Sequence, residues 1–526
     1  MANHTDSVGF FAAEVLDQTA AGQPHKTAII TKDETLSFAA LTQRVRALAG
    51  HLQEEDVGQG DRVGVLLPNS AAIPLSYFAT QKIGAVTVIL DARLKGKELE
   101  GVLKDADLKL LVIHAHLYPE VQEVFKAAAP VPVWIVGGDG ERSFERRFAP
   151  PARAAVLPRL NPDDDALILY TSGTTGEPKG VVLSYRNLAQ YPRVMREMGV
   201  TDASTVRGCI LPMSHIVGPV VCNELAERGY TLVIFDQINP ITILEGIQKY
   251  RVSVFESVPI VFQLLLGVKN LSSYDTSSMK IAAMMGTSIP LPLLRAFQAA
   301  QPHVKVIQGY GLTETSPMIT LVEPAKAEEK VGSIGRAVPG VEVRIVDESG
   351  KELGVDEPGE IITRGPHVMK GYFRRPDATA QRIRDGWLYT GDVGKRGADG
   401  YFYHLGRRDD MIITGGLNVY PAEVENMIYN FPGVQENIVF AIPDSKRGQV
   451  IGAAIVPRPG ARLVEREILA FLRANLANFK VPDKIVIRES LPRTSSGKTI
   501  RDAETLLSPP PSVSPAARGR KEEGAS

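Results

Sequence analysis

The sequence predicts an α/β fold: a large N-terminal domain with two αβ-layered sheets and a small β-rich subdomain, followed by a small mobile α+β domain. Apolar strand-like runs alternate with helical stretches through much of the chain, which is typical of largely parallel sheets. The length of 526 residues exceeds what one hydrophobic core ordinarily supports. After about residue 332 the strands shorten and turns multiply, and a fresh unit begins after Asp409.

The elements of the N-terminal part follow in order. Residues 8–23 suggest a short amphipathic helix. Ser37 is placed to cap a helix that continues to about Leu52, because a serine hydroxyl accepts a hydrogen bond from the first N–H groups of a helix. The predicted strands of this part are 27–30, 62–67, 86–90, 108–113, 133–136, 166–170 and 181–183.

The second half of the chain predicts three further parts. A β-rich subdomain is expected at about 332–403, which would complete an N-terminal domain spanning 1–408. Residues 409–507 are enough for an independent domain, with helices near 421–430 and 465–476 and a strand near 435–441. The tail 508–526 is rich in Pro, Ser and charged residues, so it is expected to be disordered.

Composition excludes several classes of partner. The formal net charge is −1, so no strong field draws the chain to nucleic acid or to anionic lipid. The richest apolar window, 252–268, contains Glu256 and other polar residues, which indicates a buried element rather than an integral membrane segment. Cys209 and Cys222 provide no disulfide framework, and the N-terminus lacks a signal-peptide pattern, so a cytoplasmic location is expected.

One segment between two predicted strands carries most of the chemical information. Residues 170–180 read Tyr-Thr-Ser-Gly-Thr-Thr-Gly-Glu-Pro-Lys-Gly. Glycine permits close approach of the backbone to a ligand, while N–H groups, hydroxyls and Lys179 suit phosphate oxygens. The common P-loop is excluded, because that motif places Gly before its lysine and then opens a helix. The segment predicts a phosphate-binding loop, against the alternative of a polar surface turn.

Further motifs follow in a fixed order along the chain. They occupy residues 211–215, 308–314, 386–392, 406–410, 415–425 and 491–498. The ordered set resembles that of the adenylate-forming enzymes, which include acyl-CoA synthetases, firefly-type luciferases and nonribosomal-peptide adenylation domains. The resemblance extends from about Thr27 to Arg501.

The resemblance implies an AMP-forming acid–thiol ligase. A carboxylate attacks the α-phosphorus of ATP to give an acyl adenylate and pyrophosphate, and a thiol, normally that of CoA, then displaces AMP. The implied partners are a small carboxylic acid, ATP, CoA and Mg²⁺, with no nucleic acid. A monomer or a homodimer is expected.

Residue roles are implied position by position. Lys498 matches the lysine that bridges the substrate carboxylate and the α-phosphate. Glu314 matches the Mg²⁺ ligand, with Thr171 as a second metal contact. Asp392 and Arg407 match the ribose contacts. The full implied nucleotide set is Thr171, Ser172, Gly173, Thr174, Thr175, Gly176, Lys179, Gly309, Tyr310, Gly311, Thr313, Asp392 and Arg407.

The second half-reaction is assigned to the C-terminal domain. Asp409 matches a hinge whose rotation would replace the face carrying Lys498 by one carrying Gly415 and Gly416, where pantetheine would pass close to the backbone. Arg447 and Lys480 match the positions that meet the nucleotide end of CoA.

The implied acyl pocket contains Met213, His215, Met285 and Gly286. The resemblance also implies a catalytic set of Lys498, His215, Glu314 and Thr171. Residues 283–290 depart from the family's small-residue pattern, since a methionine replaces a small pocket residue. Because methionine fills apolar space, a restricted pocket for a medium aliphatic, alicyclic or aromatic acid is predicted. The alternative is that Met284 and Met285 both pack into the core. No arginine lies in this segment, which disfavours a dicarboxylate.

Three rival functions remain at this stage. A stand-alone adenylation enzyme could load a carrier protein, and a luciferase-like oxygenase shares the adenylation motifs. A silent nucleotide-binding regulator is disfavoured because Lys179, Glu314 and Lys498 are intact. A serine hydrolase is not supported, since the chain has no Gly-x-Ser-x-Gly elbow.

Overall fold

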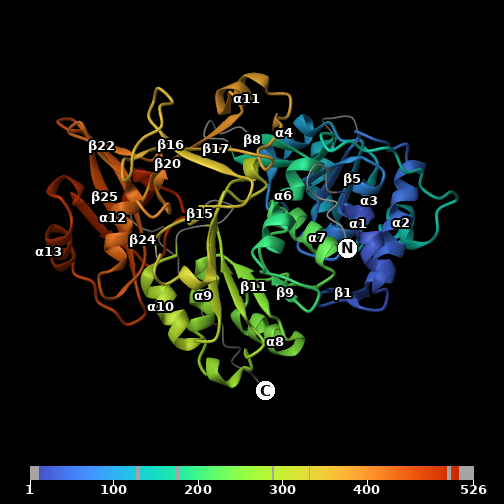
Figure 1. Cartoon of the computed structure of the whole chain (residues 1–526), viewed down its shortest axis with the longest axis horizontal. Helices are drawn as coiled ribbons and strands as arrows, with labels where there is room; N and C mark the ends of the chain where they lie inside the picture. Colours follow the sequence, from blue (N-terminus) through green and yellow to red (C-terminus); the bar gives the residue numbers. More distant parts are fainter. Residues whose placement is uncertain are drawn as a thin grey trace, which may run out of the picture. The chain divides into compact units, whose positions relative to one another are not determined.

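The computed structural model describes residues 11–125, 131–172, 178–286, 289–330, 332–493 and 499–508. The chain divides into two compact units, Met1–His404 and Leu405–Ser526 (Figure 1). Both units mix helices and strands, so the predicted α/β class is confirmed.

The first sheet of unit 1 has seven strands in the order β18-β8-β7-β4-β3-β5-β6. The strands β7, β4, β3, β5 and β6 run parallel, and β8 runs antiparallel to both of its neighbours. Their bounds are β3 Arg62–Leu66, β4 Val86–Leu90, β5 Leu110–His114, β6 Val133–Val136, β7 Asp165–Ser172, β8 Pro178–Ser184 and β18 Gly371–Tyr372.

The second sheet of unit 1 has nine strands in the order β15-β14-β13-β12-β11-β9-β10-β1-β2. The pairs from β13 through to β1 are parallel, and the outer pairs are antiparallel. Their bounds are β1 Thr27–Ile30, β2 Thr35–Ser37, β9 Val206–Cys209, β10 Thr231–Ile234, β11 Val254–Ser257, β12 Ile281–Met284, β13 Lys305–Tyr310, β14 Thr320–Val322 and β15 Arg336–Ala337.

Helices cover both sheets (Figure 1). The largest core cluster joins buried residues of both sheets to α1, α2, α3, α6 and α7, so these helices form a layer between the sheets. A second cluster packs α8, α9 and α10 on the nine-stranded sheet, and a third packs α4 and α5 on the seven-stranded sheet. The bounds are α1 Ala12–Gly22, α2 Phe38–Glu54, α3 Ala72–Lys82, α4 Gly96–Ala106, α5 Tyr118–Phe125, α6 Tyr185–Glu197, α7 Val217–Arg228, α8 Pro240–Tyr250, α9 Pro259–Leu266 and α10 Leu291–Ala300.

Local sequence signals explain how two of these helices begin. The Ser37 hydroxyl accepts from Ala40 N at 3.2 Å, which confirms the predicted cap of α2. At α6, Ser184 and Asn187 form a reciprocal capping box. The Asn187 amide also donates to the carbonyls of Pro366 and Val368, so this helix start fixes a segment far along the chain.

A smaller antiparallel sheet closes unit 1. Its order is β16-β17-β20-β19, with β21 paired to β20. The unit boundary at His404 falls within β21. The bounds are β16 Glu342–Val346, β17 Gly359–Arg364, α11 Pro376–Arg382, β19 Ile383–Arg384, β20 Trp387–Arg396 and β21 Phe402–Arg407.

Unit 2 is built on a sheet of order β23-β22-β25-β24, with β26 parallel to β25. Helices α12 and α13 pack their apolar residues on it, and α14 contributes to a second small cluster. The bounds are β22 Ile412–Thr414, β23 Leu417–Val419, α12 Pro421–Tyr429, β24 Val434–Asp444, β25 Gly448–Pro457, α13 Glu465–Asn475, β26 Lys484–Ile487 and α14 Ala503–Leu507.

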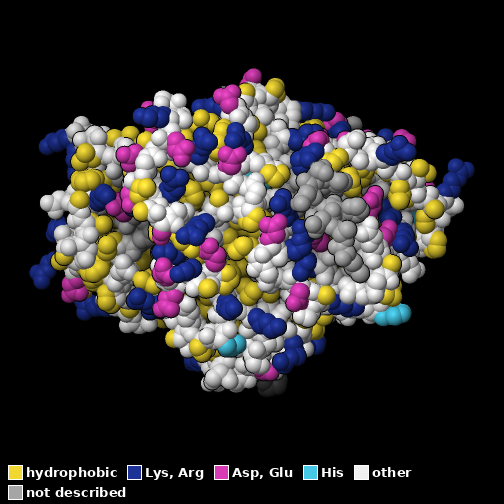
Figure 2. Space-filling view, in the orientation of Figure 1, with side chains coloured by type: hydrophobic (Ala, Val, Ile, Leu, Met, Phe, Trp, Pro, Cys, Tyr) yellow, Lys and Arg dark blue, Asp and Glu magenta, His cyan; other side chains and the backbone are white. Residues whose placement is uncertain are grey.

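The apolar window 252–268 forms β11 and α9 rather than one long helix. Among the described residues no helix is long and apolar enough to cross a membrane. Figure 2 shows basic and acidic side chains intermixed over the visible face. The tail beyond Ser508 lies outside the described residues.

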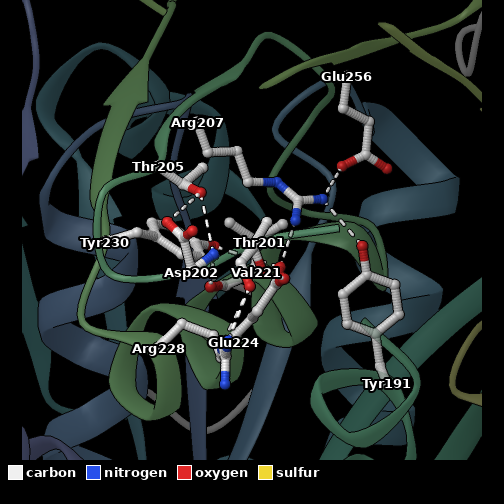
Figure 3. A network of polar contacts seen from close by, with 10 residues as sticks. All are labelled: Tyr191, Thr201, Asp202, Thr205, Arg207, Val221, Glu224, Arg228, Tyr230 and Glu256. Carbon is white, nitrogen blue, oxygen red and sulfur yellow. Dashed lines mark hydrogen bonds and ion pairs between the residues drawn. The ribbon is translucent and has the colours of Figure 1, made fainter. Parts of the chain in front are cut away.

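Unit 1 also contains a buried ionic cluster around Arg207 of β9 (Figure 3). The guanidinium donates to Glu224 of α7 and to Glu256 of β11, and it donates to the Tyr191 hydroxyl at 2.9 Å. Burial acts against the charge of Arg207, yet the neighbouring tyrosine and carboxylates hold its pKa well above the usual range. Burial raises the pKa of Glu224 despite the nearby guanidinium. The cluster replaces what would otherwise be apolar packing between sheet and helix.

Candidate active site

The candidate site residues of unit 1 follow the carboxyl ends of parallel strands. Met213 and His215 follow β9, Met285 and Gly286 follow β12, and Gly309 to Glu314 close β13. These strands run parallel in one sheet, so their carboxyl ends lie along the same edge, where open α/β sheets bind ligands. In the other sheet, Thr171 lies at the carboxyl end of β7.

The predicted phosphate loop joins β7 to β8. The two strands pair up to the loop, with Thr171 opposite Lys179 and Ser172 opposite Pro178. The Thr171 hydroxyl donates to the Lys179 carbonyl at 3.4 Å. Gly173, Thr174, Thr175 and Gly176 lie outside the described residues, as does the side chain of Ser172. The structure therefore shows how the loop is anchored at both ends.

The segment after β13 holds its shape through close backbone contacts. A Cβ on Gly311 would lie 1.5 Å from the Pro317 carbonyl oxygen, so only glycine leaves room there. Thr313 opens the short helix η5, Thr313–Thr315, and the Thr315 hydroxyl accepts from Leu312 N at 2.8 Å. This compact turn sets the direction of Glu314.

Glu314 is held by groups that the sequence did not single out. Its Oε1 accepts from the Tyr372 hydroxyl at 2.9 Å, and its carbonyl accepts from Met369 N at 2.9 Å. The Lys179 ammonium lies 5.7 Å from the centroid of the Tyr372 ring. Burial and the Glu314 charge raise the pKa of Tyr372, so its hydroxyl remains a donor at neutral pH.

Asp392 forms a second group with two aromatic side chains. It is buried, and its Oδ2 accepts from the Tyr310 hydroxyl at 2.5 Å. His404 Nε2 lies 3.6 Å from Asp392 Oδ1, and the His404 and Tyr310 ring centroids are 5.8 Å apart. The carboxylate and the aromatic ring expected at the ribose and the adenine are thus in direct contact. Sequence reasoning missed His404, because only its place three residues before Arg407 marked it.

His215 has neighbours from the opposite sheet. Its Nε2 accepts from Arg93 Nη2 at 3.1 Å, since a guanidinium can only donate. Arg93 in turn pairs with Asp91 at 2.6 Å, just after β4. Although burial opposes it, hydrogen bonds and charge from Arg93 hold the pKa of Asp91 below its usual range. This contact brings the carboxyl ends of β4 and β9 together, and no local pattern in the sequence indicated it.

The two methionines of the expected acyl pocket behave differently. Met284 is fully buried in the core cluster under α8, α9 and α10. Met285 is partly buried, and its sulfur lies near Gly309, 3.5 Å from where a Cβ would stand. Gly286 has φ +88°, and Met213 is buried. Of the two methionines, Met285 therefore lies beside Gly309, near the carboxyl end of β13.

The donor set near the phosphate loop fits a magnesium ion held mainly by phosphates and water. Glu314 would supply a carboxylate oxygen to such an ion, and Thr171 would supply a hydroxyl. Among the described residues no cluster of three or more His, Cys, Asp or Glu side chains could hold a metal. Magnesium commonly takes only one or two carboxylates beside nucleotide phosphates, so the donor set is adequate.

In unit 2, Gly415 and Gly416 form the turn of the β22–β23 hairpin. Their φ values are +57° and +81°, as a two-residue hairpin turn requires, and an added Cβ would meet nothing within 4 Å. The backbone of this turn is therefore open. Asp409 is exposed, and Lys498 lies outside the described residues.

A further ionic group lies close to the expected hinge. Asp410 pairs with Arg501 at 3.3 Å, and Arg501 pairs with Glu425 of α12 at 2.5 Å. Burial raises the pKa of Asp410 against the pull of Arg501 and Arg407. These ion pairs thus hold the segment that follows Arg407 against helix α12 and the segment around Arg501.

The two residues expected at CoA are both engaged with acids. Arg447 pairs with Asp483, and Lys480 pairs with Glu423. The Lys480 ammonium also lies 5.6 Å from the Phe479 ring centroid. An anionic ligand here would compete with two carboxylates for these cations.

Comparison with known proteins matches most of the chain to one family of enzymes. The family model described as AMP-binding enzyme matches residues 16–373, and the model of the AMP-binding enzyme C-terminal domain matches 423–498. A feruloyl-CoA synthase from Amycolatopsis sp is 36% identical, covering 91% of this chain and 95% of the relative. A long-chain-fatty-acid–CoA ligase from Bacillus subtilis strain 168 is 32% identical, covering 93% and 92%.

Among solved structures, ATP-bound MatB from Rhodopseudomonas palustris superposes with a TM-score of 0.85 at 32% identity, covering 93% of this chain and 97% of that one. The matched regions include both units, and ATP and CoA are the co-substrates of this class of ligase. The chain therefore belongs to the AMP-binding enzyme family, among the adenylate-forming acyl-CoA synthetases.

Proposed function

We propose that this AMP-forming acid–CoA ligase activates a medium aliphatic, alicyclic or aromatic carboxylic acid with MgATP. The observation that carries the proposal is Met285, which lies partly buried beside Gly309 at the carboxyl ends of β12 and β13. A flexible apolar side chain there limits the length of an acyl group that enters next to the nucleotide. The two relatives described above are named for an aromatic acid and for long-chain fatty acids, so relatives of this chain act on both aromatic and aliphatic acids.

In the first step a carboxylate oxygen bonds to the α-phosphorus while the bond to the bridging oxygen breaks. Pyrophosphate leaves with that electron pair. Lys179 and the loop N–H groups attract the outer phosphates, and Lys498 holds the carboxylate against the α-phosphate. Such a fixed donor contributes about 10²–10³ in rate.

The nucleoside is held by a separate group of side chains. Asp392 accepts from the ribose hydroxyls, Arg407 also reaches the ribose, and Tyr310 lies against the adenine. The contact between Tyr310 and Asp392 at 2.5 Å supports this assignment, because it aligns ring and carboxylate before ATP arrives. A magnesium ion, when bound, neutralises phosphate charge, and Glu314 and Thr171 would hold it.

In the second step the CoA sulfur bonds to the acyl carbon, the thiol loses its proton, and AMP leaves with the electron pair of the broken bond. Rotation at Asp409 brings the open turn of Gly415 and Gly416 to the pantetheine. Arg447 and Lys480 then exchange their carboxylate partners for CoA phosphates. The substitution Asp409→Pro should preserve pyrophosphate release and abolish thioester formation, because proline fixes φ.

The test is release of pyrophosphate and AMP across short, medium, long, alicyclic and aromatic acids, with and without CoA. We expect fast, CoA-dependent turnover on medium or cyclic acids. Lys498→Ala should lower adenylate formation about 10²–10³-fold. The matched change Lys484→Ala, at an exposed position of β26, should leave it unchanged. Pyrophosphate release that CoA does not accelerate would instead indicate a carrier-protein acceptor.

The adjacent methionines provide a test of the pocket. Met285→Ala should shift preference toward longer acids at little cost in stability, because Met285 is only partly buried. Met284→Ala should lower the free energy of unfolding by about 2–5 kcal/mol without changing the preference, since Met284 lies in the core. An unchanged chain-length profile in Met285→Ala would refute the restricted pocket.

A further inference from the structure

Tyr372 joins two residues of the proposed phosphate site that come from different parts of the chain. It belongs to β18, which pairs with β8 so that Tyr372 lies opposite Val181. Phe373 N donates to the Gly180 carbonyl at 2.7 Å, and Lys370 N donates to the Val182 carbonyl at 3.0 Å. This pairing places Tyr372 beside the strand that begins at the phosphate loop.

The position of the Tyr372 side chain is closely determined. The residue is 8% exposed, and its backbone N–H donates to the Thr379 hydroxyl at 2.8 Å. Gly371 before it has φ +152°, and a Cβ there would lie 2.6 Å from Thr379 Cγ2. The backbone at Tyr372 is therefore held against helix α11, and the side chain it carries is buried.

The hydroxyl and the ring of Tyr372 contact different partners. The hydroxyl donates to Glu314 Oε1 at 2.9 Å. The electron-rich ring lies 5.7 Å from the Lys179 ammonium, within the range of a cation–π contact.

We propose that Tyr372 is a positioning residue, which holds the Glu314 carboxylate and the Lys179 ammonium in place for the magnesium–triphosphate group of ATP. The inference rests on the proposed roles of Glu314 and Lys179. The hydroxyl fixes one carboxylate oxygen, so that the other oxygen could bind a metal ion, and the ring limits the positions of the lysine. Outer groups of this kind typically change metal affinity about 10–100-fold.

Two substitutions separate the hydroxyl from the ring. Tyr372→Phe should weaken Mn²⁺ binding to the ATP complex about 10–100-fold, measured by electron paramagnetic resonance. It should leave ATP binding in EDTA nearly unchanged, because the ring remains. Tyr372→Leu should also weaken ATP binding in EDTA by about 2–5-fold, since Lys179 loses its contact.

Tyr401 provides a closely matched control within unit 1. Its hydroxyl donates to Glu323 at 2.7 Å, and Lys330 and Arg336 lie 5.2 and 4.5 Å from its ring centroid. Tyr401→Phe therefore removes the same kind of hydrogen bond without touching the site. If both Phe variants bind Mn²⁺ equally well, Tyr372 has only a packing role and the inference is wrong.

A double-mutant cycle tests whether the hydroxyl acts through Glu314. In a Glu314→Gln background, Tyr372→Phe should produce little further loss of Mn²⁺ affinity. A full additional loss would contradict the proposed route. Pyrophosphate release by the unaltered protein tests the proposed ligase function separately. A failure of the proposed function can therefore be distinguished from a failure of the Tyr372 inference.

Discussion

Two polar groups in unit 1 use similar residues in opposite ways. In the Arg207 cluster, buried carboxylates contact a guanidinium and tyrosine hydroxyls inside the protein (Figure 3). At the proposed nucleotide site, Glu314 and Asp392 accept from Tyr372 and Tyr310, at the ends of strands. The first group satisfies its charges internally. In the second, a neutral tyrosine hydroxyl donates to one oxygen of each carboxylate, so this hydrogen bond does not neutralise the carboxylate charge.

The largest expected effect concerns the Arg207 cluster. Arg207→Met should lower the free energy of unfolding by about 3–5 kcal/mol, because it leaves two buried carboxylates without their cation. Urea denaturation of the full chain measures this. Arg186→Met removes an exposed pair with Asp163 and should change little. Equal stability of the two variants would show that the Arg207 cluster does not depend on its charge.

The next largest effect is expected at the proposed nucleotide site. Asp392→Asn should raise the KM for ATP about 10–100-fold, because a charged acceptor for the ribose is lost. Its stability should change less than that of Arg207→Met, since the two side chains have nearly the same shape. Asp356→Asn, in an exposed turn of the same part of unit 1, should leave the KM unchanged.

A third prediction concerns His367, a buried side chain that is neutral in the folded protein at pH 7. His367 is fully buried, its Nε2 lies 2.9 Å from the Thr363 hydroxyl, and burial lowers its pKa to about 4. The unfolded chain takes up a proton near pH 6.5 and the folded chain does not, so stability falls as pH drops from 6.5 toward 4. The loss by pH 5 should be about 2 kcal/mol.

Urea unfolding at several pH values checks this slope. His367→Gln should lose that share of the pH dependence, whatever its stability at pH 7. A variant whose stability keeps the original dependence on pH would show that other groups cause it.

The smallest expected effect is on thiol reactivity, which measures how often the Arg207 cluster opens to solvent. Cys209 lies two residues after Arg207, and burial, with the nearby Glu256, raises its thiol pKa to about 12. Burial also raises the pKa of Cys222. Neither thiol of the folded protein should react with a disulfide reagent at pH 8, whereas both should react in urea. Reaction of Cys209 in the folded state would reveal solvent entry beside Arg207.

The sequence was most informative where the signal is local. The alternation of strands and helices and the Ser37 cap depend on neighbouring residues, and the observed elements lie close to the expected ones. The glycines of the motif after β13 reflect close backbone approach, but the turn that carries Glu314 was not predicted from them. The roles of the site residues and the expected hinge stay predictions.

Contacts between residues far apart in the chain could not be predicted from local sequence patterns. Glu256 was visible only as an interruption of an apolar window, although its partner Arg207 lies 49 residues earlier. The pairs of Tyr372 with Glu314 and of Arg93 with His215 join segments 58 and 122 residues apart. Such pairs follow from sheet order, which periodicity does not reveal.

The place of β1 in the nine-stranded sheet has a consequence for synthesis on the ribosome. Its parallel partner is β10, and the Thr19 hydroxyl donates to the Ala226 carbonyl, 207 residues later. At about 5–20 residues per second, the early segment waits about 10–40 s for this partner to emerge. The segment is therefore translated well before its partner strand, and it is a natural target for chaperones until β10 has been synthesised.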